Sequence, residues 1–484
     1  MTDDRLEFYD PLYETIVFER GLPRQGFQRL QPDYPLDPRD IVRTAEFSRL
    51  AFLNQVGLAW LIFPSATHTR YAHSIGCWWL GKIAETLIKV RSNSSEKTLH
   101  LWLQNLELRE EFYLSLLLHD IGHGPLSHVL ERNPLFVDAL KAAGIKETDH
   151  EHRGADLLLG RGPIWEVWLE LARRRYGNST TTFKDLREGT LLSEKVCLPA
   201  ISYLMTGDKE YLEECNHHHK SELGVVKELV SGLLDLDRLD HYARDSYFSG
   251  LRHVSINLRG FLTNLRFEPD GDRAFLSLSA DGAAYAAGLL FSKRQILGAM
   301  FRTPRAVALH AMANAALTSY LEALQPKERS EASLRIAWMQ DAEFLDCMAA
   351  GTSDISTRIV QDIRALRPYR LVRKFTRADL PAKITRKSLE AFGGDASRRH
   401  ASTVLVYFDP GFFDRARPRE SQDWLDTGRL ILEDSGTPLT EHPDHKADFA
   451  YLREPDRSRH VWIFCENDSI LSKVGAEVDE LIRA

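Results

Sequence analysis

The sequence lacks the features that place a chain in a membrane or in an oxidising compartment. No apolar run is long enough to span a bilayer, and the acidic stretch 1–5 has no apolar signal core. The five cysteines show no paired spacing, which is typical of reduced thiols rather than of a disulfide framework. We therefore expect a cytoplasmic protein that has no membrane partner.

A basic excess, a low-complexity tract and an internal repeat are also absent. The chain has 62 lysines and arginines against 69 acidic residues, so its net charge of -7 gives no general attraction to nucleic acid. The basic stretch 364–386 contains two aromatic residues, Tyr369 and Phe375, and we interpret it as a solvated helix face or a subunit contact. We expect no nucleic-acid partner.

The chain of 484 residues is longer than one ordinary hydrophobic core requires. We expect an irregular entry arm over 1–40, rich in proline, aspartate and aromatic residues. A mainly helical domain is expected over 41–330, and a smaller α+β lobe over 331–484. The predicted fold class is therefore mainly α, with a few short strands and a small C-terminal lobe.

Apolar residues recur at helical spacing along most of the middle of the chain. The spacing predicts helices over 41–55, 70–90, 112–120, 150–159, 223–247 and 282–324. Thr148 and Asp149 are suited to cap the fourth of these helices. Alternating apolar residues predict strands over 267–278, with a turn at Asp270-Gly271, and over 403–408 and 460–465.

The most informative stretch is the run His119-Asp120-Ile121-Gly122-His123-Gly124-Pro125-Leu126-Ser127-His128, which ends an apolar helical segment. Imidazole and carboxylate groups together bind borderline or hard divalent metals. The glycines allow the backbone to leave the helix, so that neighbouring side chains can turn toward one point. Because a stable core gains nothing from titratable groups beside a leucine face, the run predicts a functional site.

Distant segments complete a metal-ligand set if they meet in the fold. The set contains two imidazoles and two carboxylates, which belong to His73, His119, Asp120 and Asp237. Such mixed nitrogen and oxygen donors suit Mn, Fe, Zn or Mg. With three helices contributing, coordination positions stay open for water or phosphate, so the sequence predicts a divalent-metal cofactor.

A polar stripe continues from one of these ligands along its helix. Asp237, His241 and Asp245 are spaced four residues apart and therefore lie on one helix face. At about 1.5 Å per residue the stripe spans roughly 12 Å, comparable with a nucleoside and its phosphates. Two arginines near these segments, Arg70 and Arg238, have the charge to neutralise a phosphate.

Two further polar clusters have a simpler interpretation. Asp235 and Asp240 flank the stripe and are typical of a salt-bridged helix surface. The tract 217–219 consists of three histidines without a partner at metal-binding spacing, and we expect a solvated loop there.

The motifs resemble the HD-domain phosphohydrolase superfamily and, within it, the deoxynucleoside triphosphate triphosphohydrolases. The similarity runs from about residue 41 to residue 324 and lies in four ordered blocks with matching internal spacing. The blocks are Phe47–Gln55, Phe63–Gly76, His119–His128 and Leu236–Asp245. The resemblance implies an HD-type helical core over this part of the chain.

By position, the resemblance implies roles for individual residues. Metal ligation falls to His73, His119, Asp120 and Asp237. Gln55 and Asp245 are expected to contact the sugar, with His241 on the same stripe. The residues expected to contact the phosphates are Arg70, Arg238 and Arg294. The histidines around the scissile α-phosphate are His123, His128 and His150, with His152 as a near alternative to His150.

Three positions depart from the family pattern. Arg302 stands where the family has a tyrosine that packs on the sugar, and His241 replaces a second tyrosine. Both changes weaken the case for strict deoxyribose selectivity. Arg43 stands where the animal enzyme has an acidic residue of its guanine-nucleotide regulatory site, so we do not expect that allosteric site.

The resemblance implies metal-dependent hydrolysis of (deoxy)nucleoside triphosphates at the α-phosphate, which yields nucleoside and inorganic triphosphate. His128, or else His123, would protonate the departing 5′-oxygen. One alternative is an HD phosphohydrolase of a monophosphate or a signalling nucleotide, and another is a catalytically silent nucleotide-binding regulator. Self-association as a dimer or tetramer is expected by resemblance.

Overall fold

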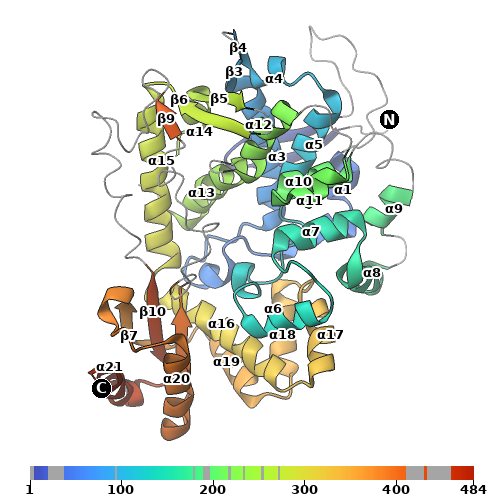
Figure 1. Ribbon diagram of the computed structural model, residues 1–484. Coiled ribbons are helices and arrows are strands. Elements are labelled where there is room, and N and C mark those ends of the chain that lie inside the picture. Colours follow the sequence, from blue (N-terminus) through green and yellow to red (C-terminus); the bar gives the residue numbers. More distant parts are fainter. Residues whose placement is uncertain are drawn as a thin grey trace.

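The structure is a computed structural model. It describes residues 5–19, 38–92, 95–177, 180–188, 197–215, 220–232, 235–251, 256–270, 273–409, 412, 430–432 and 459–483. Helices dominate this part of the chain, and its strands form three small sheets (Figure 1). The predicted mainly α fold class is confirmed.

Three helices at the centre of the core carry most of the predicted site. They are α3 (Arg70–Leu87), α5 (Leu106–Leu118) and α13 (Leu236–Ser249), and α3 packs against both of the others. The first helices around them are α1 (Pro38–Val42), α2 (Ala45–Ser48), α4 (Leu99–Trp102), α6 (Pro134–Ala142), α7 (His150–Leu159), α8 (Gly162–Tyr176) and α9 (Phe183–Glu188). The later ones are α10 (Leu198–Thr206), α11 (Lys209–Glu213), α12 (Lys220–Ser231), α14 (Leu258–Thr263), α15 (Gly282–Ile296) and α16 (Pro304–Glu322).

Side-chain caps explain where two of the site helices begin. The Thr69 hydroxyl accepts a hydrogen bond from the backbone N–H of Ala72 at the start of α3. Asp149 accepts one from the backbone N–H of His152 at the start of α7. The helix predicted over 150–159, with Asp149 as its cap, is therefore confirmed.

The single helix expected over 223–247 is wrong, because this segment forms the two helices α12 and α13. Asp235 caps α13 by accepting a hydrogen bond from the backbone N–H of Arg238, and its extended backbone (φ -73°, ψ 159°) interrupts the helix. In the same way, a π-helical turn over Leu297–Phe301 separates α15 from α16 within the predicted helix 282–324. Apolar periodicity alone did not distinguish one helix from two.

The irregular arm expected over 1–40 is wrong for residues 5–19, which form an antiparallel hairpin. Strand β1 (Arg5–Asp10) pairs with strand β2 (Glu14–Glu19) along their whole lengths. The remaining parts of the expected arm, 1–4 and 20–37, lie outside the described residues.

The hairpin forms because its inner face packs on the helical core. Ile16 and Phe18 are two residues apart, so both side chains lie on the same face of β2, and both are buried. The Phe18 ring stacks on Trp78 of α3 with a centroid distance of 4.2 Å. A large buried aromatic contact therefore attaches the hairpin to the helix that carries His73.

A second sheet lies beside the core in the order β4-β3-β5-β6-β9. Its strands are β3 (Lys89–Ser92), β4 (Ser95–Thr98), β5 (Leu265–Asp270), β6 (Arg273–Leu278) and β9 (Leu430–Leu432). The strand pair predicted over 267–278 is confirmed as β5 and β6, which are antiparallel. Gly271 of the expected turn lies outside the described residues.

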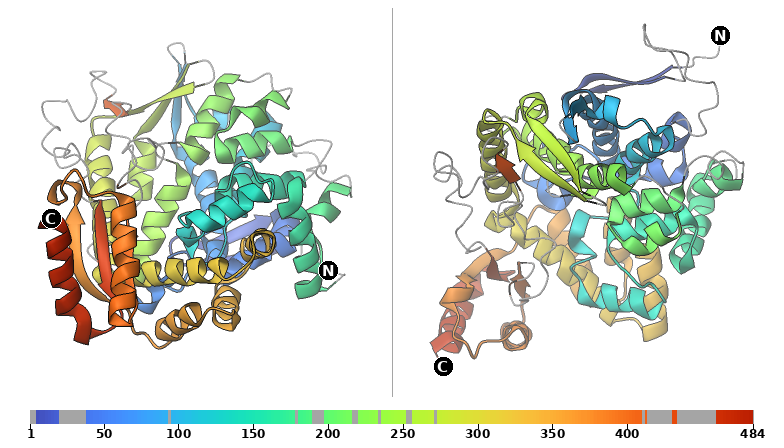
Figure 2. Two further views of the ribbon diagram at one scale, coloured as in Figure 1. Left: turned by 60° about the horizontal axis from the view of Figure 1, so that its bottom comes forward. Right: turned by 45° about the horizontal axis from the view of Figure 1, so that its top comes forward.

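The third sheet has the antiparallel order β7-β10-β8 and forms the C-terminal lobe. Its strands are β7 (Arg370–Thr376), β8 (Val404–Phe408) and β10 (His460–Cys465), and they pack with α20 (Arg386–His400) and α21 (Leu471–Arg483). The lobe lies at one edge of the molecule in both views of Figure 2 and stands away from the helical core in the right-hand view. The strands predicted over 403–408 and 460–465 are confirmed, whereas the basic stretch 364–386, interpreted as a helix face, contains β7.

Three helices connect the core to this lobe, namely α17 (Pro326–Ile336), α18 (Asp341–Ala350) and α19 (Asp354–Arg364). They pack with the main core, because α19 contacts α16 and because Trp338, Phe344 and Ile359 belong to the main hydrophobic cluster. A separate cluster that includes Val372 and Val474 lies within the lobe. The domain boundary at residue 330 stays a prediction.

None of the helices in the described part of the chain combines the length and the apolar character that a membrane crossing needs. The five cysteines are free thiols, and the Sγ atoms of Cys197 and Cys215 lie 2.9 Å apart. The cytoplasmic location stays a prediction.

Candidate functional site

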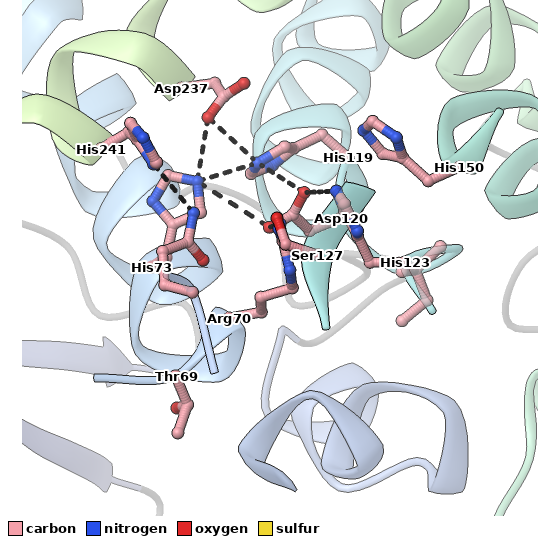
Figure 3. Close-up of polar contacts among 12 residues, drawn as sticks. Thr69, Arg70, His73, His119, Asp120, His123, Ser127, His150, Asp237 and His241 are labelled. Carbon is pink, nitrogen blue, oxygen red and sulfur yellow. Dashed lines mark hydrogen bonds and ion pairs between the residues drawn. The ribbon is translucent and has the colours of Figure 1, made fainter. Parts of the chain in front are cut away.

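The predicted metal ligands lie together where α3, α5 and α13 meet (Figure 3). His73 lies on α3, and His119 caps the C-terminus of α5, with Asp120 directly after it. The Nε2 atoms of His73 and His119 are 3.2 Å apart, and Asp237 Oδ1, in the first turn of α13, lies 2.9 Å and 3.5 Å from them. Asp120 completes the group, since its carboxylate oxygens lie 3.6 Å from His119 Nε2 and 3.9 Å from His73 Nε2.

These separations fit one divalent ion. Donors that lie about 2.0 to 2.2 Å from an ion in tetrahedral or octahedral geometry are roughly 3 to 3.5 Å from one another. The two imidazoles and Asp237 lie 2.9 to 3.5 Å apart, close to this range, while Asp120 lies slightly farther away, 3.6 and 3.9 Å from the two imidazoles. The donor set therefore suits Mn, Fe, Mg or Zn and does not select among them.

A buried thiol also borders the cluster. Cys77 Sγ lies one helical turn along α3 and 3.7 Å from His73 Nε2. Burial raises the pKa of the Cys77 thiol well above its ordinary value, so it is protonated at neutral pH while no ion is bound, and Mn and Mg prefer nitrogen and oxygen donors to sulfur. The nitrogen and oxygen atoms remain the better donors.

Hydrogen bonds on the far side of each imidazole direct its Nε2 atom toward the cluster. His119 Nδ1 donates to the carbonyl oxygen of Leu116 at 2.9 Å. His73 Nδ1 donates to Asp240 Oδ2 at 2.7 Å. Metal-binding histidines use this arrangement in general, because the second hydrogen bond selects the tautomer and the ring orientation.

A second histidine cluster adjoins the first. The rings of His123 and His150 are stacked with centroids 3.8 Å apart, and the His128 ring lies 5.1 Å from that of His123. Glu131 joins two of these rings, because its carboxylate accepts hydrogen bonds from Nδ1 of His150 at 2.9 Å and from Nδ1 of His128 at 3.1 Å. The three predicted histidines therefore lie together, and Asp120 Oδ1 is 3.7 Å from His123 Nε2.

The histidines of this second cluster differ in proton affinity. Burial lowers the pKa of His150, but the Glu131 carboxylate outweighs that effect and raises the pKa to about 9. Burial and the charges of Arg70 and His150 hold the pKa of His123 well below its ordinary value. A protonated imidazole and a neutral one therefore lie side by side at neutral pH, which is the arrangement expected for acid and base roles.

The near alternative to His150 lies elsewhere. His152 Nδ1 donates to the Asp149 carboxylate at 2.8 Å, and its Nε2 lies 3.6 Å from Asp208. The structure therefore brings His150, rather than His152, to the cluster.

The three predicted phosphate-binding arginines have different surroundings. Arg70 is buried and donates to Asp120 at 2.7 Å and to the Ser127 hydroxyl at 2.9 Å. Arg238 pairs with Asp235 at 3.2 Å, and its side chain is 45% exposed. Arg294 lies on the exposed side of α15, which packs against α13. Arg70 is thus part of the metal-ligand cluster, while the other two guanidiniums lie nearer solvent.

A line of polar side chains extends from the cluster along α13. Gln55 Nε2 donates to His241 Nδ1 at 3.0 Å, and His241 Nε2 lies 3.2 Å from Asp245 Oδ2. His68, which we did not predict, lies 2.7 Å from Asp245 Oδ1 and stacks on Phe248. Gln55 Oε1 is buried and has no hydrogen-bond partner among the described residues, so it is an unsatisfied acceptor beside His241.

The interpretation of Asp235 and Asp240 as a salt-bridged helix surface is wrong about the surface, because both pair with arginines of α13 but both are buried. Asp240 is fully buried and accepts the His73 hydrogen bond, and Asp235 is 3% exposed and caps α13. Glu131 was also missed, although it lies only three residues after His128, in the turn that follows the short helix Ser127–Val129. No local signal indicated His68. The histidine tract 217–219 lies outside the described residues.

No protein-family model matches the chain. The chain is 29% identical over 225 residues, 45% of its length, to the deoxynucleoside triphosphate triphosphohydrolase SAMHD1 homolog of Dictyostelium discoideum. It is 28% identical over 219 residues, 43% of its length, to an HD domain-containing protein of Acanthamoeba polyphaga mimivirus. The chain spans less than half the length of the curated relatives it matches.

A solved structure with a similar fold comes from Bacteroides thetaiotaomicron and is described as a phosphohydrolase. The TM-score is 0.59, the match covers 96% of this chain and all of that one, and the sequences are 18% identical. Together with the relatives above, this shared fold confirms the resemblance to HD-domain phosphohydrolases that the sequence motifs indicate.

Proposed function

We propose that this protein is a metal-dependent phosphohydrolase that cleaves (deoxy)nucleoside triphosphates at the α-phosphate to give nucleoside and inorganic triphosphate. The observation that carries this proposal is the convergence of donor atoms from His73, His119 and Asp237 within 4.8 Å of one another, directly beside a second histidine cluster. The name of the Dictyostelium relative supports a nucleotide substrate.

In this proposal His73, His119, Asp120 and Asp237 hold a Mn, Fe, Mg or Zn ion. When bound, such an ion supplies Lewis-acid stabilisation of the charge that develops on phosphoryl oxygens. Arg70 then acts on the ligand Asp120 rather than on the substrate, because its guanidinium is buried against that carboxylate.

The reaction needs a proton donor for the leaving group. A water molecule attacks the α-phosphorus in line, and the bond from phosphorus to the 5′-oxygen breaks. His150 donates its proton to that oxygen, because Glu131 keeps this imidazole protonated at neutral pH. This assignment replaces the earlier expectation of His128 or His123, since burial lowers the pKa of both of those rings.

The remaining predicted residues bind the substrate. Gln55 Oε1 accepts a hydrogen bond from a sugar hydroxyl, since this buried atom has no partner among the described residues. We assign Arg238 and Arg294, whose side chains lie near solvent, to the triphosphate tail, whose negative charge they would offset. The departures at His241 and Arg302 leave ribonucleotides as candidate substrates.

The experiment that tests the proposal is a nucleotide panel with manganese, in which the phosphate product is identified by ion chromatography. Inorganic triphosphate is expected. His119→Ala and Asp237→Ala should lose metal binding and turnover together, whereas His400→Ala, a histidine of the C-terminal lobe paired with Glu477, should retain both.

Other products identify the alternatives. Release of pyrophosphate or single phosphate would contradict cleavage at the α-phosphate. Turnover of a monophosphate or a signalling nucleotide would indicate another HD phosphohydrolase, and binding without turnover would indicate a silent regulator. Self-association as a dimer or tetramer stays a prediction, which mass photometry of the purified chain can check.

A further inference from the structure

The turn of the N-terminal hairpin reaches a metal ligand through a single intervening carboxylate. The Tyr13 hydroxyl donates a hydrogen bond to Asp240 Oδ1 at 2.8 Å. The other oxygen of the same carboxylate, Asp240 Oδ2, accepts a hydrogen bond from His73 Nδ1 at 2.7 Å. His73 and Asp240 are both fully buried, so no water competes for these contacts.

Arg244 also binds the Asp240 carboxylate, in addition to Tyr13 and His73. Its Nε donates to Asp240 Oδ2 at 2.8 Å, and its Nη2 donates to Asp240 Oδ1 at 2.9 Å. With Tyr13 and His73, each carboxylate oxygen accepts two hydrogen bonds, which is the capacity of an ionised carboxylate. Asp240 therefore has no freedom to turn away from His73.

The hairpin also completes the surroundings of Arg244. Asp10 Oδ2 accepts a hydrogen bond from Arg244 Nη1 at 2.7 Å. Asp10 Oδ1 accepts hydrogen bonds from the backbone N–H groups of Leu12 at 2.9 Å and of Tyr13 at 3.3 Å, which sets the shape of the turn. Asp10 thus shapes the turn that carries Tyr13 and also pairs with Arg244, the arginine that binds Asp240.

We infer that the hairpin turn 10–13 is part of the metal centre, with Tyr13 as a positioning residue that acts on His73 through Asp240. This inference rests on the proposed metal-binding function. A carboxylate that accepts the Nδ1 proton of a ligating histidine leaves Nε2 free to bind the ion, and its own partners determine how well it does so. Removing the Tyr13 hydroxyl should therefore weaken metal binding without touching a ligand.

The test compares Tyr13→Phe with Tyr9→Phe in the full chain. Both changes remove one phenolic hydroxyl from the same hairpin, but Tyr9 is 83% exposed and serves as the matched control. Manganese affinity is measured from the electron paramagnetic resonance signal of the free ion. We expect Tyr13→Phe to weaken binding about tenfold and Asp240→Asn to weaken it by up to about 100-fold, the range typical of groups behind a metal ligand.

A spectroscopic measurement separates positioning from stability. At saturating cobalt, the visible absorption of the bound ion reports ligand geometry, so a loss of fold stability alone leaves it unchanged. We expect a shifted spectrum for Tyr13→Phe and the wild-type spectrum for Tyr9→Phe. If Tyr13→Phe matches Tyr9→Phe in both manganese affinity and cobalt spectrum, the inference is overturned, even if nucleotide hydrolysis is observed.

Failure of the proposed reaction can be distinguished from failure of this inference. If the wild-type chain binds manganese and hydrolyses no nucleotide, while Tyr13→Phe weakens binding and shifts the cobalt spectrum, the proposed reaction fails and the inference stands. A wild-type chain that binds neither metal overturns both.

Discussion

At the scale of single residues, Glu131 determines which histidine of the second cluster carries a proton. Its carboxylate contacts both His150 and His128. His150 is the one that also donates its backbone N–H to Glu131 and lies at the start of α7. Burial lowers the pKa of both rings and Glu131 raises it, but only at His150 does the carboxylate outweigh burial, so the pKa of His150 is about 9 and that of His128 stays lowered. Proton transfer in the proposed reaction therefore depends on one carboxylate that touches no metal ligand in the described contacts.

The first prediction concerns pH. Because the pKa of His150 is raised from 6.5 to about 9, its imidazole stays protonated through neutral pH and loses its proton as the pH rises through about 9. We expect kcat to fall along that alkaline limb. His150→Gln should lower kcat by about 100-fold or more and abolish the limb, as is typical for loss of a general acid.

The control for this prediction is His400→Gln, in which a paired histidine is changed far from the site. It should retain the wild-type pH profile of kcat. A His150→Gln enzyme that keeps the alkaline limb would show that another group supplies the proton.

At the scale of secondary-structure elements, the close approach of α3 and α13 brings His73 and Asp237 together. Gly76 lies on α3 one turn after His73, and a Cβ atom there would lie 2.2 Å from Arg244 Nη2 and 2.5 Å from Asp240 Oδ1. Arg244 is fully buried and paired with two carboxylates, so it cannot move aside freely. The absence of a side chain at residue 76 is therefore a requirement of this helix pair.

The second prediction follows from that contact. Gly76→Ala should lower the free energy of unfolding by about 1 to 3 kcal/mol, the usual cost of overpacking, and should also weaken manganese binding. Chemical denaturation with circular dichroism measures the first effect, and metal titration measures the second.

Gly288→Ala is the matched control, because this residue lies within α15 and a Cβ atom there meets nothing within 4 Å. Alanine should stabilise that helix by roughly 0.5 to 1 kcal/mol. Equal stability of the two alanine variants would mean that α3 and α13 adjust to the added methyl group.

At the scale of the whole molecule, the proposed metal centre joins segments that are far apart in the chain. His73 and Asp237 are 164 residues apart, and His73 and His119 are 46 residues apart. An ion held by these side chains binds the folded chain and not the unfolded one, because the unfolded chain does not bring the ligands together. Metal binding is therefore expected to be coupled to the stability of the helical core.

The third prediction is a metal-dependent melting temperature. Free manganese at about 100 times its dissociation constant should stabilise the fold by about 2.7 kcal/mol, so the melting temperature should rise, and a chelator should reverse the rise. Differential scanning fluorimetry measures this effect. The same addition should not change the melting temperature of His119→Ala, and an equal rise in both proteins would place the ion elsewhere.

Much of this architecture follows from local chemistry. The spacing of apolar residues predicted the helix over 150–159, and the capping preference of Asp149 explained its start. The same approach missed the break before α13, because Asp235 interrupts the helix without interrupting the apolar pattern. Residues 5–19 were missed because the burial that makes them strands comes from α3, which lies outside any local window.

The sequence by itself determined the chemical types at the candidate site and the order of the blocks that supply them. Only the tertiary structure decided the role of each carboxylate. Asp237 contacts the Nε2 atoms of the two imidazoles, whereas Asp240, three residues later, accepts the hydrogen bond of His73 Nδ1. The physical reason is that an aspartate takes its role from its hydrogen-bond partners. For Asp240 one of those partners is Tyr13, which is 227 residues away in the chain and comes near only when the hairpin packs on the core.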